Sequence, residues 1–202
     1  MKRFHDFKDA LRKDVKNRAR LCREEIEFVL AREDDCGVLM KQLEEGILPL
    51  RVTHNDTKLN NILFDKNTGE GLCIIDLDTI MPGLAANDFG DSIRFGASTA
   101  EEDEKDLNKV HFDIELYRIY VKGYLEMAKD VLTPAENASL PWGARLMTLE
   151  CGMRFLADFL QGDVYFKTTY PEHNLVRART QFRLVKEMEE QFDEMQKIVE
   201  TF

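Results

Sequence analysis

Hydrophobic residues recur every three or four positions along most of the chain, which is the spacing of amphipathic α-helices. The first such stretch, residues 6–33, is rich in charged residues, and its pattern allows one interruption of the helix. The same period returns in several later segments, up to the C-terminal region. The pattern predicts helices over residues 6–33, 35–45, 114–128, 134–161 and 175–199.

Start and stop signals agree with these boundaries. Gly46 follows the second expected helix and Gly162 follows the fourth, and glycine commonly adopts the left-handed conformation just after a helix. Thr133 followed by Pro134 is a typical N-cap with proline in the first turn. These signals favour a mainly helical domain.

A different pattern occupies residues 50–82. Two short apolar runs, 61–64 and 72–75, flank the turn-forming residues 65–69, which together form a hairpin signal. Residues 82–100 are rich in Gly, Asn, Asp and Ser and are expected to form an irregular functional loop. The fold class is therefore expected to be α+β, mainly helical, with one small β-hairpin.

Composition limits the classes of function. The chain has 202 residues, the size of one ordinary domain, and its 28 basic and 38 acidic side chains give a formal net charge of −10. This balance argues against a protein that binds duplex nucleic acid and against a basic membrane-surface module. No apolar stretch approaches the roughly 20 residues that span a bilayer, and the first residues carry no signal-peptide core. The four cysteines, without a C-x-x-C pair, are expected to be reduced, which predicts a cytoplasmic location.

The candidate chemistry lies at the expected hairpin. Pairing of its two apolar runs would bring Asn61 and Asp76 side by side at the open end. An amide oxygen and a carboxylate are hard ligands suited to Mg²⁺, which takes few protein ligands and fills its shell with phosphates and water. Asp56, five residues before Asn61, is close enough along the chain to reach the same place.

A catalytic-loop signature precedes the hairpin. His54, Asp56 and Asn61 have the H-x-D-x-x-x-x-N spacing of protein-kinase-like enzymes. A carboxylate base, a cation and two metal ligands are what phosphoryl transfer requires of a protein. On these residues the sequence resembles the aminoglycoside phosphotransferase and choline kinase superfamily. Within it, HNDTKLNNILFD and CIIDLDTIMPGLAANDFGDSIRFGA are similar to N-acetylhexosamine 1-kinases, and the likeness extends over most of the chain through FHDF and RFLADFLQGDVYF.

The resemblance implies a role for each matching residue. Asp56 is implied to be the catalytic base, which orients the acceptor hydroxyl and accepts its proton. Lys58 is implied to neutralise the phosphoryl group during transfer. Asn61 and Asp76 are implied to hold the metal ion, and His54 is implied to be structural.

Three neighbouring positions need separate interpretation. Asn55 stands where glycine is more usual, and asparagine tolerates uncommon backbone conformations. Asp78 has two open interpretations: a contact to a second metal or to substrate, and a solvated carboxylate. The sequence DFG at 88–90 matches the metal-binding motif of protein kinases, but it begins 32 residues after Asp56, when the hairpin is already complete. We therefore predict that Asp88 anchors the catalytic loop instead of binding metal.

Other charged residues are expected to be surface charges or ion pairs, and they remain candidates for lining an acceptor pocket. This group consists of Arg94, Asp158, Asp163, Arg177 and Arg179. Solvated faces are predicted for the acidic runs Glu101–Glu104 and Glu187–Glu194.

The sequence before residue 50 contains no recognisable nucleotide clamp. Kinases of this kind place a glycine-rich loop and a strand lysine over the nucleotide, and neither is found. The resemblance implies a single helical C-terminal lobe, residues 1–202, with catalytic loop and metal hairpin at 50–82 and without the N-terminal nucleotide-binding lobe. The polypeptide alone is therefore expected to have little or no kinase activity. The face left by the absent lobe is expected to favour self-association.

Three functional hypotheses follow. The leading one is a phosphotransferase lobe that moves the γ-phosphoryl group of ATP, with Mg²⁺, to the hydroxyl of a small-molecule sugar such as an N-acetylhexosamine. The second is a non-catalytic kinase-like binding module. The third is a kinase for another acceptor, such as choline, an aminoglycoside or a hydroxy amino acid. A choline pocket needs an aromatic cage, which the single Trp142 and dispersed tyrosines do not predict.

Overall fold

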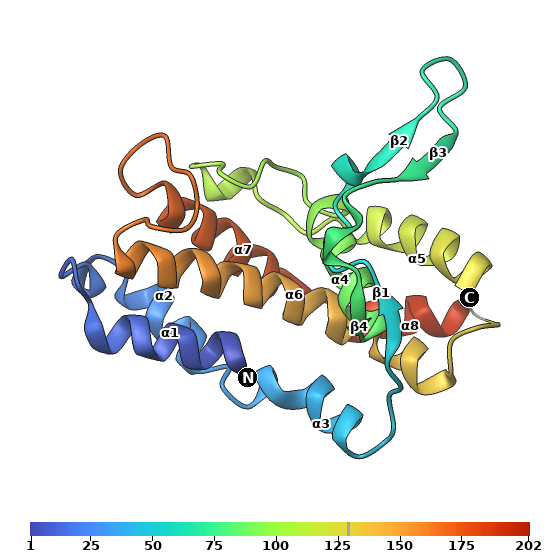
Figure 1. The fold of residues 1–202 in the computed structure, drawn as a ribbon, viewed down its shortest axis with the longest axis horizontal. Coiled ribbons are helices and arrows are strands. Elements are labelled where there is room, and N and C mark those ends of the chain that lie inside the picture. The colour runs from blue at the N-terminus through green and yellow to red at the C-terminus, as the bar shows by residue number, and fades with distance from the viewer. Residues whose placement is uncertain (129) are drawn as a thin grey trace.

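Most of the described chain is helical, and the helices surround one long central helix, α6 (Figure 1). The computed structural model describes residues 1–128 and 130–202. The helices are α1 Lys2–Lys13, α2 Arg23–Leu30, α3 Val38–Glu44, α4 Ala85–Gly96, α5 Ile114–Ala128, α6 Pro134–Gln161, α7 His173–Glu190 and α8 Phe192–Thr201. The strands are β1 Arg51–Thr53, β2 Ile62–Phe64, β3 Gly71–Ile74 and β4 Met81–Gly83. The expected mainly helical α+β class is confirmed.

Both predicted ends of α6 are confirmed. Thr133 Oγ1 accepts from the backbone N–H of Glu136, and the Glu136 carboxylate accepts from the N–H of Thr133. This capping box, with Pro134 at the first helical position, satisfies N–H groups that a helix start otherwise leaves free. The helix ends at Gly162, which has a φ of 99°, a conformation in which glycine is favoured.

Two hydrophobic clusters hold all of the other helices except α3 against α6, and a smaller third cluster joins α3 to it. One cluster joins α6 to α1, α2 and α7 and contains the fully buried Phe4 and Phe7. The other joins it to α4, α5, α7 and α8 and contains Phe89 and Tyr117. Each large apolar side chain that is fully buried contributes roughly 1.5–3 kcal/mol. The apolar period seen in the sequence therefore encodes a core around α6.

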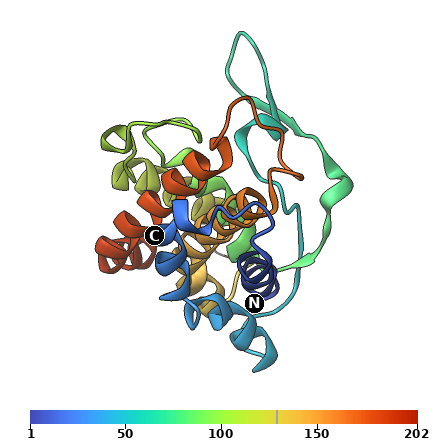
Figure 2. The same ribbon diagram turned by 90° about the vertical axis from the view of Figure 1, so that its left-hand side faces the viewer.

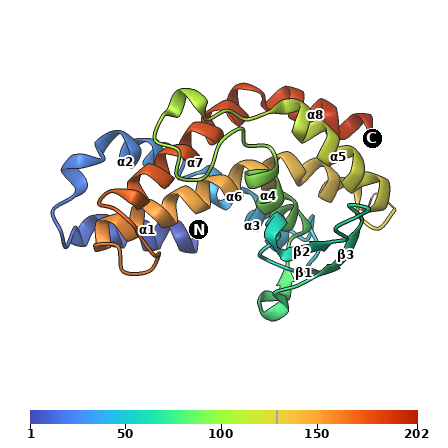
Figure 3. The same ribbon diagram turned by 90° about the horizontal axis from the view of Figure 1, so that it is seen from above.

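The strands form two small antiparallel pairs on one side of the helices (Figures 2 and 3). β1 pairs with β4, and β2 pairs with β3 to form the hairpin. The hairpin turn is closed by Asp65, whose carboxylate accepts from the N–H groups of Asn67 and Thr68. Gly69 follows with a φ of 72°. The two apolar runs predicted to pair do so in the structure.

The predicted register of the hairpin is wrong by one residue. Ile62 lies opposite Ile74, and the N–H of Ile75 donates to the carbonyl of Asn61 at 2.9 Å. Asn61 therefore faces Ile75 rather than Asp76. The register shifts between Leu63 and Phe64, and symmetry about an assumed turn centre cannot anticipate such an irregularity.

The prediction of an irregular segment over 82–100 is also wrong, because α4 occupies most of it. Gly90 of α4 is needed for packing, because a Cβ on it would lie 2.2 Å from the carbonyl oxygen of Gly143 in α6. A Cβ on Gly143 would likewise lie 2.0 Å from the carbonyl oxygen of Ala86. The helix thus uses small residues to approach α6 closely. Composition alone does not separate this use of glycine from a loop.

Two stretches predicted to be helical each form two separate helices in the structure. The stretch 6–33 forms α1 and α2, with the one break that its pattern allowed. The stretch 175–199 forms α7 and α8 with an unexpected break at Gln191. The acidic run at 187–194 is only partly solvated, since Glu187 is buried and Glu189 forms ion pairs with Arg32 and Arg145. In the part of the chain that the structure describes, every helix is too short or too polar to cross a membrane.

His111 predicts a pH dependence of folding stability. Its Nδ1 lies 3.0 Å from Glu187 and its Nε2 lies 2.8 Å from the carbonyl of Asn108, and both contacts raise its pKa above the ordinary 6.5. The charged imidazole is thus favoured in the folded state, although nearby Arg183 opposes it. This stabilisation is fully present below the unfolded-state pKa and is lost as pH rises through the folded-state pKa.

We expect His111→Gln to remove that part of the pH dependence of the melting temperature between about pH 5 and about pH 9. The matched control is His5→Gln, at an exposed position of α1. Thermal unfolding followed by circular dichroism checks the prediction. An unchanged pH profile in His111→Gln would contradict it.

Candidate active site

The loop between β1 and β2 brings together three of the predicted site residues. Asp56 Oδ2 accepts hydrogen bonds from Lys58 Nζ at 2.7 Å and from Asn61 Nδ2 at 2.9 Å. The same amide nitrogen of Asn61 also donates to the Asp56 carbonyl at 2.8 Å. Among the described residues, no group donates to Asp56 Oδ1, which leaves that oxygen available to a ligand.

These contacts fix the charges of the cluster. Burial raises the pKa of Asp56, but the hydrogen bonds from Lys58 and Asn61 outweigh it, so the pKa lies below its ordinary value. The hydrogen bond to Asp56 raises the pKa of Lys58, and the carboxylates of Asp76 and Asp91 raise it further. At neutral pH the site therefore holds a carboxylate and an ammonium in direct contact.

The loop takes its shape from Asn55. This residue has a φ of 64°, in the left-handed region that asparagine tolerates better than most residues, as the sequence led us to expect. Its side-chain amide donates to the carbonyls of Thr53 and Thr79 at 3.1 and 3.0 Å. The backbone is thus turned at the residue that directly precedes Asp56.

Helix α4 holds the same loop through Asp88. The two carboxylate oxygens of Asp88 accept from the backbone N–H groups of His54 and Asn55 at 2.7 and 2.8 Å. Burial raises the pKa of Asp88 and outweighs the opposing effect of these hydrogen bonds. In the DFG sequence, Asp88 thus contacts the loop, Phe89 is buried in the core, and Gly90 allows the close contact with α6.

Sequence reasoning missed three further contacts of α4 with the loop, all of which involve Thr57. In one of them, Thr57 Oγ1 donates to the backbone carbonyl of Asp88 at 2.5 Å. The N–H of Thr57 donates to Asp91 Oδ2 at 2.9 Å, and Ser92 Oγ donates to the carbonyl of Thr57 at 3.0 Å. Asp88, Asp91 and Ser92 follow the i, i+3, i+4 spacing of one helical face. That spacing is visible in the sequence, but it indicates a shared face only once residues 85–96 are known to form a helix.

Asp76 and Asp78 lie at the base of the hairpin and are both exposed. Asp76 has a φ of 64°, and the carbonyl just before it, that of Ile75, lies 2.9 Å from His54 Nε2. Among the described residues, neither aspartate side chain has a hydrogen-bond partner. The free carboxylate of Asp76 and the amide oxygen of Asn61, whose nitrogen is bound to Asp56, are the donor types that Mg²⁺ accepts. Within residues 1–128 and 130–202, no cluster of three or more His, Cys, Asp or Glu side chains could hold a metal.

A cavity of about 450 Å³ opens beside Asp56. Asp56, Lys58 and Asn61 line one part of it, and most of the remaining wall is apolar or aromatic. Phe89 contacts Tyr120 and Tyr124 with ring centroids 5.6 and 5.2 Å apart. The aromatic wall was not expected from the sequence, because the two tyrosines lie on α5, distant in sequence from both α4 and the loop.

Both tyrosines of this wall are neutral at physiological pH. Burial raises the pKa of Tyr120 above its ordinary value and raises that of Tyr124 to about 12. The wall thus presents aromatic rings with hydroxyl groups and no negative charge of its own. The ionised groups of the cavity include those of the catalytic loop, as well as Arg51, which pairs with Glu136 at 2.7 Å.

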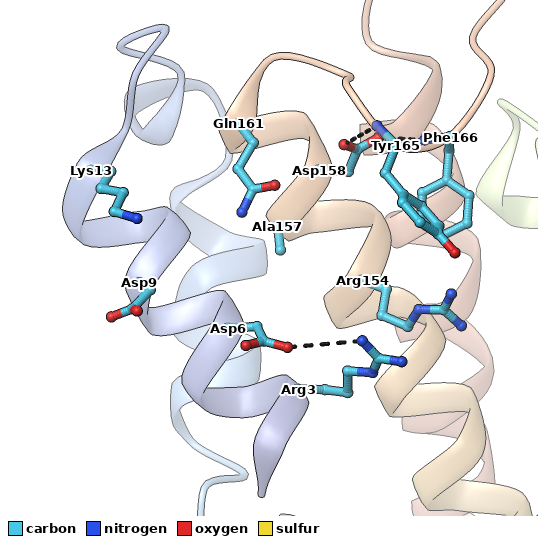
Figure 4. Close-up of a pocket in the computed structure, with 10 residues that line it drawn as sticks. All are labelled: Arg3, Asp6, Asp9, Lys13, Arg154, Ala157, Asp158, Gln161, Tyr165 and Phe166. Carbon is cyan, nitrogen blue, oxygen red and sulfur yellow. Dashed lines mark hydrogen bonds and ion pairs between the residues drawn. The ribbon is translucent and has the colours of Figure 1, made fainter.

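A second cavity, of about 340 Å³, lies between α1 and the C-terminal part of α6 (Figure 4). Asp158 borders it but is only 3% exposed, and its carboxylate is hydrogen-bonded to the turn that follows α6. Its carboxylate accepts from the backbone N–H groups of Val164, Tyr165 and Phe166, and from the side chain of Asn174. Asp158 therefore fixes the turn, which leaves Tyr165 73% exposed beside Arg154.

Most of the remaining charged candidates form ion pairs, as expected. Asp163 pairs with Arg18, and Arg179 pairs with Glu25. The expected solvation of the acidic run 101–104 is wrong in part: Glu102 lies 2.7 Å from Arg94, and Asp103 lies 3.0 Å from His173. Burial of these partners, which the sequence does not reveal, explains the difference.

Comparison with known proteins agrees with this geometry. The model of the phosphotransferase enzyme family (APH) matches residues 2–129, which is more than half of the chain. The match contains the loop, the hairpin and α4, and thus every residue that the structure brings to Asp56 from these three elements. The chain therefore belongs to the phosphotransferase enzyme family, in agreement with the aminoglycoside phosphotransferase and choline kinase superfamily that the catalytic-loop residues indicated.

Proposed function

We propose that this chain is the catalytic lobe of a small-molecule kinase that transfers the γ-phosphoryl group of ATP to a sugar hydroxyl, such as that of an N-acetylhexosamine. The observation that supports it best is the state of Asp56. The carboxylate is ionised, is held through Oδ2 by Lys58 and Asn61, and borders a cavity. A base has to be within hydrogen-bond reach of the proton that it takes, and Oδ1 satisfies that condition for an acceptor in the cavity.

In this proposal Asp56 Oδ1 accepts the proton of the acceptor hydroxyl while the hydroxyl oxygen forms a bond to the γ-phosphorus of ATP. The bond from that phosphorus to the bridging oxygen of ADP breaks, and ADP leaves with the bonding electron pair. Lys58 keeps its positive charge next to the reacting groups, where it offsets the charge of the phosphoryl oxygens. The hydrogen bonds from α4 to the loop keep Asp56 in position.

The amide oxygen of Asn61 and the carboxylate of Asp76 are proposed to hold the metal ion. A magnesium ion would neutralise charge on the nucleotide phosphates there. His54 contributes by bonding to the carbonyl that precedes Asp76. Asp78 keeps its two interpretations, since it lies next to the same turn and is exposed.

Exposed apolar side chains around the loop support the proposal that a separate nucleotide-clamping lobe covers this face and is needed for turnover. They come from the two strand pairs and the turns beside them. Figure 3 shows where these strands lie relative to the helices. A surface of this kind is usually an interaction site. Without that lobe it would favour self-association. The side chains are Val52, Leu59, Leu63, Phe64, Leu72, Ile74, Ile75, Leu77, Ile80 and Met81.

One observation favours a second candidate acceptor. Phe89, Tyr120 and Tyr124 give the cavity beside Asp56 an aromatic wall, and aromatic faces attract quaternary ammonium groups. A choline-like acceptor would place its cation against this wall and its hydroxyl near Asp56. The sequence alone gave no reason to expect such a wall.

The proposal is tested by measuring ADP release with ATP and Mg²⁺ against hexosamines, choline and aminoglycosides. We expect little turnover from residues 1–202 alone and clear turnover when a nucleotide-clamping lobe is supplied as a second polypeptide. EDTA should abolish the turnover, because the phosphates then lose their counter-ion. Turnover with choline but no sugar would favour the second candidate. No turnover with any acceptor, in both forms, would leave a non-catalytic kinase-like binding module.

A further inference from the structure

Arg94 lies on α4, one turn beyond Asp91, and its side chain is only 9% exposed. Its guanidinium contacts Asp91 Oδ1 through Nε at 3.4 Å and through Nη2 at 3.3 Å. Burial opposes its charge, but the neighbouring acidic groups, among them the carboxylates of Asp91 and Glu102, outweigh burial, so the pKa of Arg94 lies above its ordinary value. The arginine is therefore a permanent cation inside the protein.

Glu102 also holds the Arg94 side chain in place. Its Oε1 accepts from Arg94 Nη1 at 2.7 Å, and its backbone carbonyl accepts from Thr180 Oγ1 at 2.6 Å. Thr180 belongs to α7, which packs on α6. Glu102 is thus tied to the helical core at its backbone and to Arg94 at its carboxylate.

The other oxygen of Asp91 contacts the catalytic loop. Asp91 Oδ2 accepts from the N–H of Thr57 at 2.9 Å, and Thr57 directly follows Asp56. The contacts form one continuous series from Glu102 through Arg94 and Asp91 to Thr57. Without the arginine, the buried Asp91 carboxylate would lose its ion-pair partner, and a buried charge without a partner is a state that proteins avoid.

We propose that Arg94, held by Glu102, is a positioning residue that fixes the catalytic loop through Asp91. This inference rests on the proposed function in one respect only, namely that the loop containing Asp56 is catalytic. Arg94 borders a cavity of about 440 Å³ and is absent from the lining of the separate cavity beside Asp56. It therefore acts on the loop and contacts neither nucleotide nor acceptor in the latter cavity.

The test is amide-resolved hydrogen exchange by NMR on the full chain, which needs no turnover. In Arg94→Met, exchange of the Thr57 amide should become faster by about tenfold or more, because a hydrogen bond to a charged group contributes about 1.5–3 kcal/mol. Amides in the middle of α6 and α7 should change much less. Arg94→Lys should restore part of the protection, since it returns the charge without the planar guanidinium.

Arg32→Met is the matched control. Like Arg94, Arg32 is a largely buried arginine that is paired with a glutamate: Glu189 accepts from its Nε and Nη2 at 2.8 and 2.6 Å. Its loss should lower stability and leave the Thr57 amide slow relative to α6. If Arg94→Met accelerates exchange equally in the loop and in the core, the ion pair is only a general stabiliser and the proposal is wrong.

Glu102→Gln provides a second variant if Arg94→Met does not fold. It keeps Arg94 and Asp91 and removes only the outer charge, so a smaller acceleration confined to the loop is expected. Unchanged exchange at Thr57 in a folded variant would overturn the proposal. Failure of the proposed function is a separate result, because it would appear as absent ADP release with the local exchange effect still present.

Discussion

Asp56→Asn should lower the rate of phosphotransfer by about 10²- to 10⁴-fold, the usual contribution of a general base. The asparagine has nearly the same shape, but its side chain cannot accept the acceptor proton. Asp56 is part-buried and lies in a loop that α4 holds through backbone groups, so the fold should persist. ADP release at saturating acceptor, in the form of the protein that turns over, measures the effect.

Asp65→Asn is the matched control for this experiment. Asp65 lies at the hairpin turn, where its side chain accepts two backbone hydrogen bonds that an asparagine oxygen can also accept. Its replacement should leave the rate nearly unchanged. Equal rates for Asp56→Asn and the unmodified protein would remove Asp56 from the proposed role of base.

Gly143→Ala should destabilise the protein by about 3 kcal/mol, at the upper end of the usual cost of overpacking. The added Cβ would lie 2.0 Å from the carbonyl oxygen of Ala86, and a backbone atom cannot move aside as a flexible side chain can. Helix α4 would have to separate from α6. Because Asp88 and Asp91 are on α4, the catalytic loop would lose part of its support at the same time.

Urea denaturation of Gly143→Ala and Gly123→Ala together tests this prediction. Gly123 is an exposed residue inside α5, and a Cβ there would meet no atom within 4 Å. Alanine at this position should stabilise the helix by roughly 0.5–1 kcal/mol. Opposite signs for the two variants are expected, and a harmless Gly143→Ala would contradict the tight contact of α4 with α6.

The candidate site was predictable to the extent that it is local in sequence. Asp56, Lys58 and Asn61 lie within six residues, so their spacing already placed them together, and the structure joins them through hydrogen bonds. The position of Asp76 depends on the hairpin register, and the observed register places it one residue beyond Ile75, which lies opposite Asn61. The roles of these residues stay predictions until turnover is measured.

Contacts between distant segments were not predictable in the same way. Glu102 looks like one member of a solvated acidic run, and its partner Arg94 looks like a surface charge. Their burial depends on α4 packing against α6 and on α7 lying beside the 101–104 segment. The aromatic wall from Tyr120 and Tyr124 depends likewise on how α5 packs.

The sequence by itself determined the helical periodicity, the caps of α6, the hairpin turn and the order of groups in the catalytic loop, because each depends on neighbours a few residues apart. Only the tertiary structure decided that residues 85–96 form a helix, that this helix holds the loop, and which charges are buried. Glycine and aspartate favour loops when they are solvated. Against α6, the glycines allow close packing and the aspartates bond to the loop, and the free energy of those long-range contacts outweighs local preference.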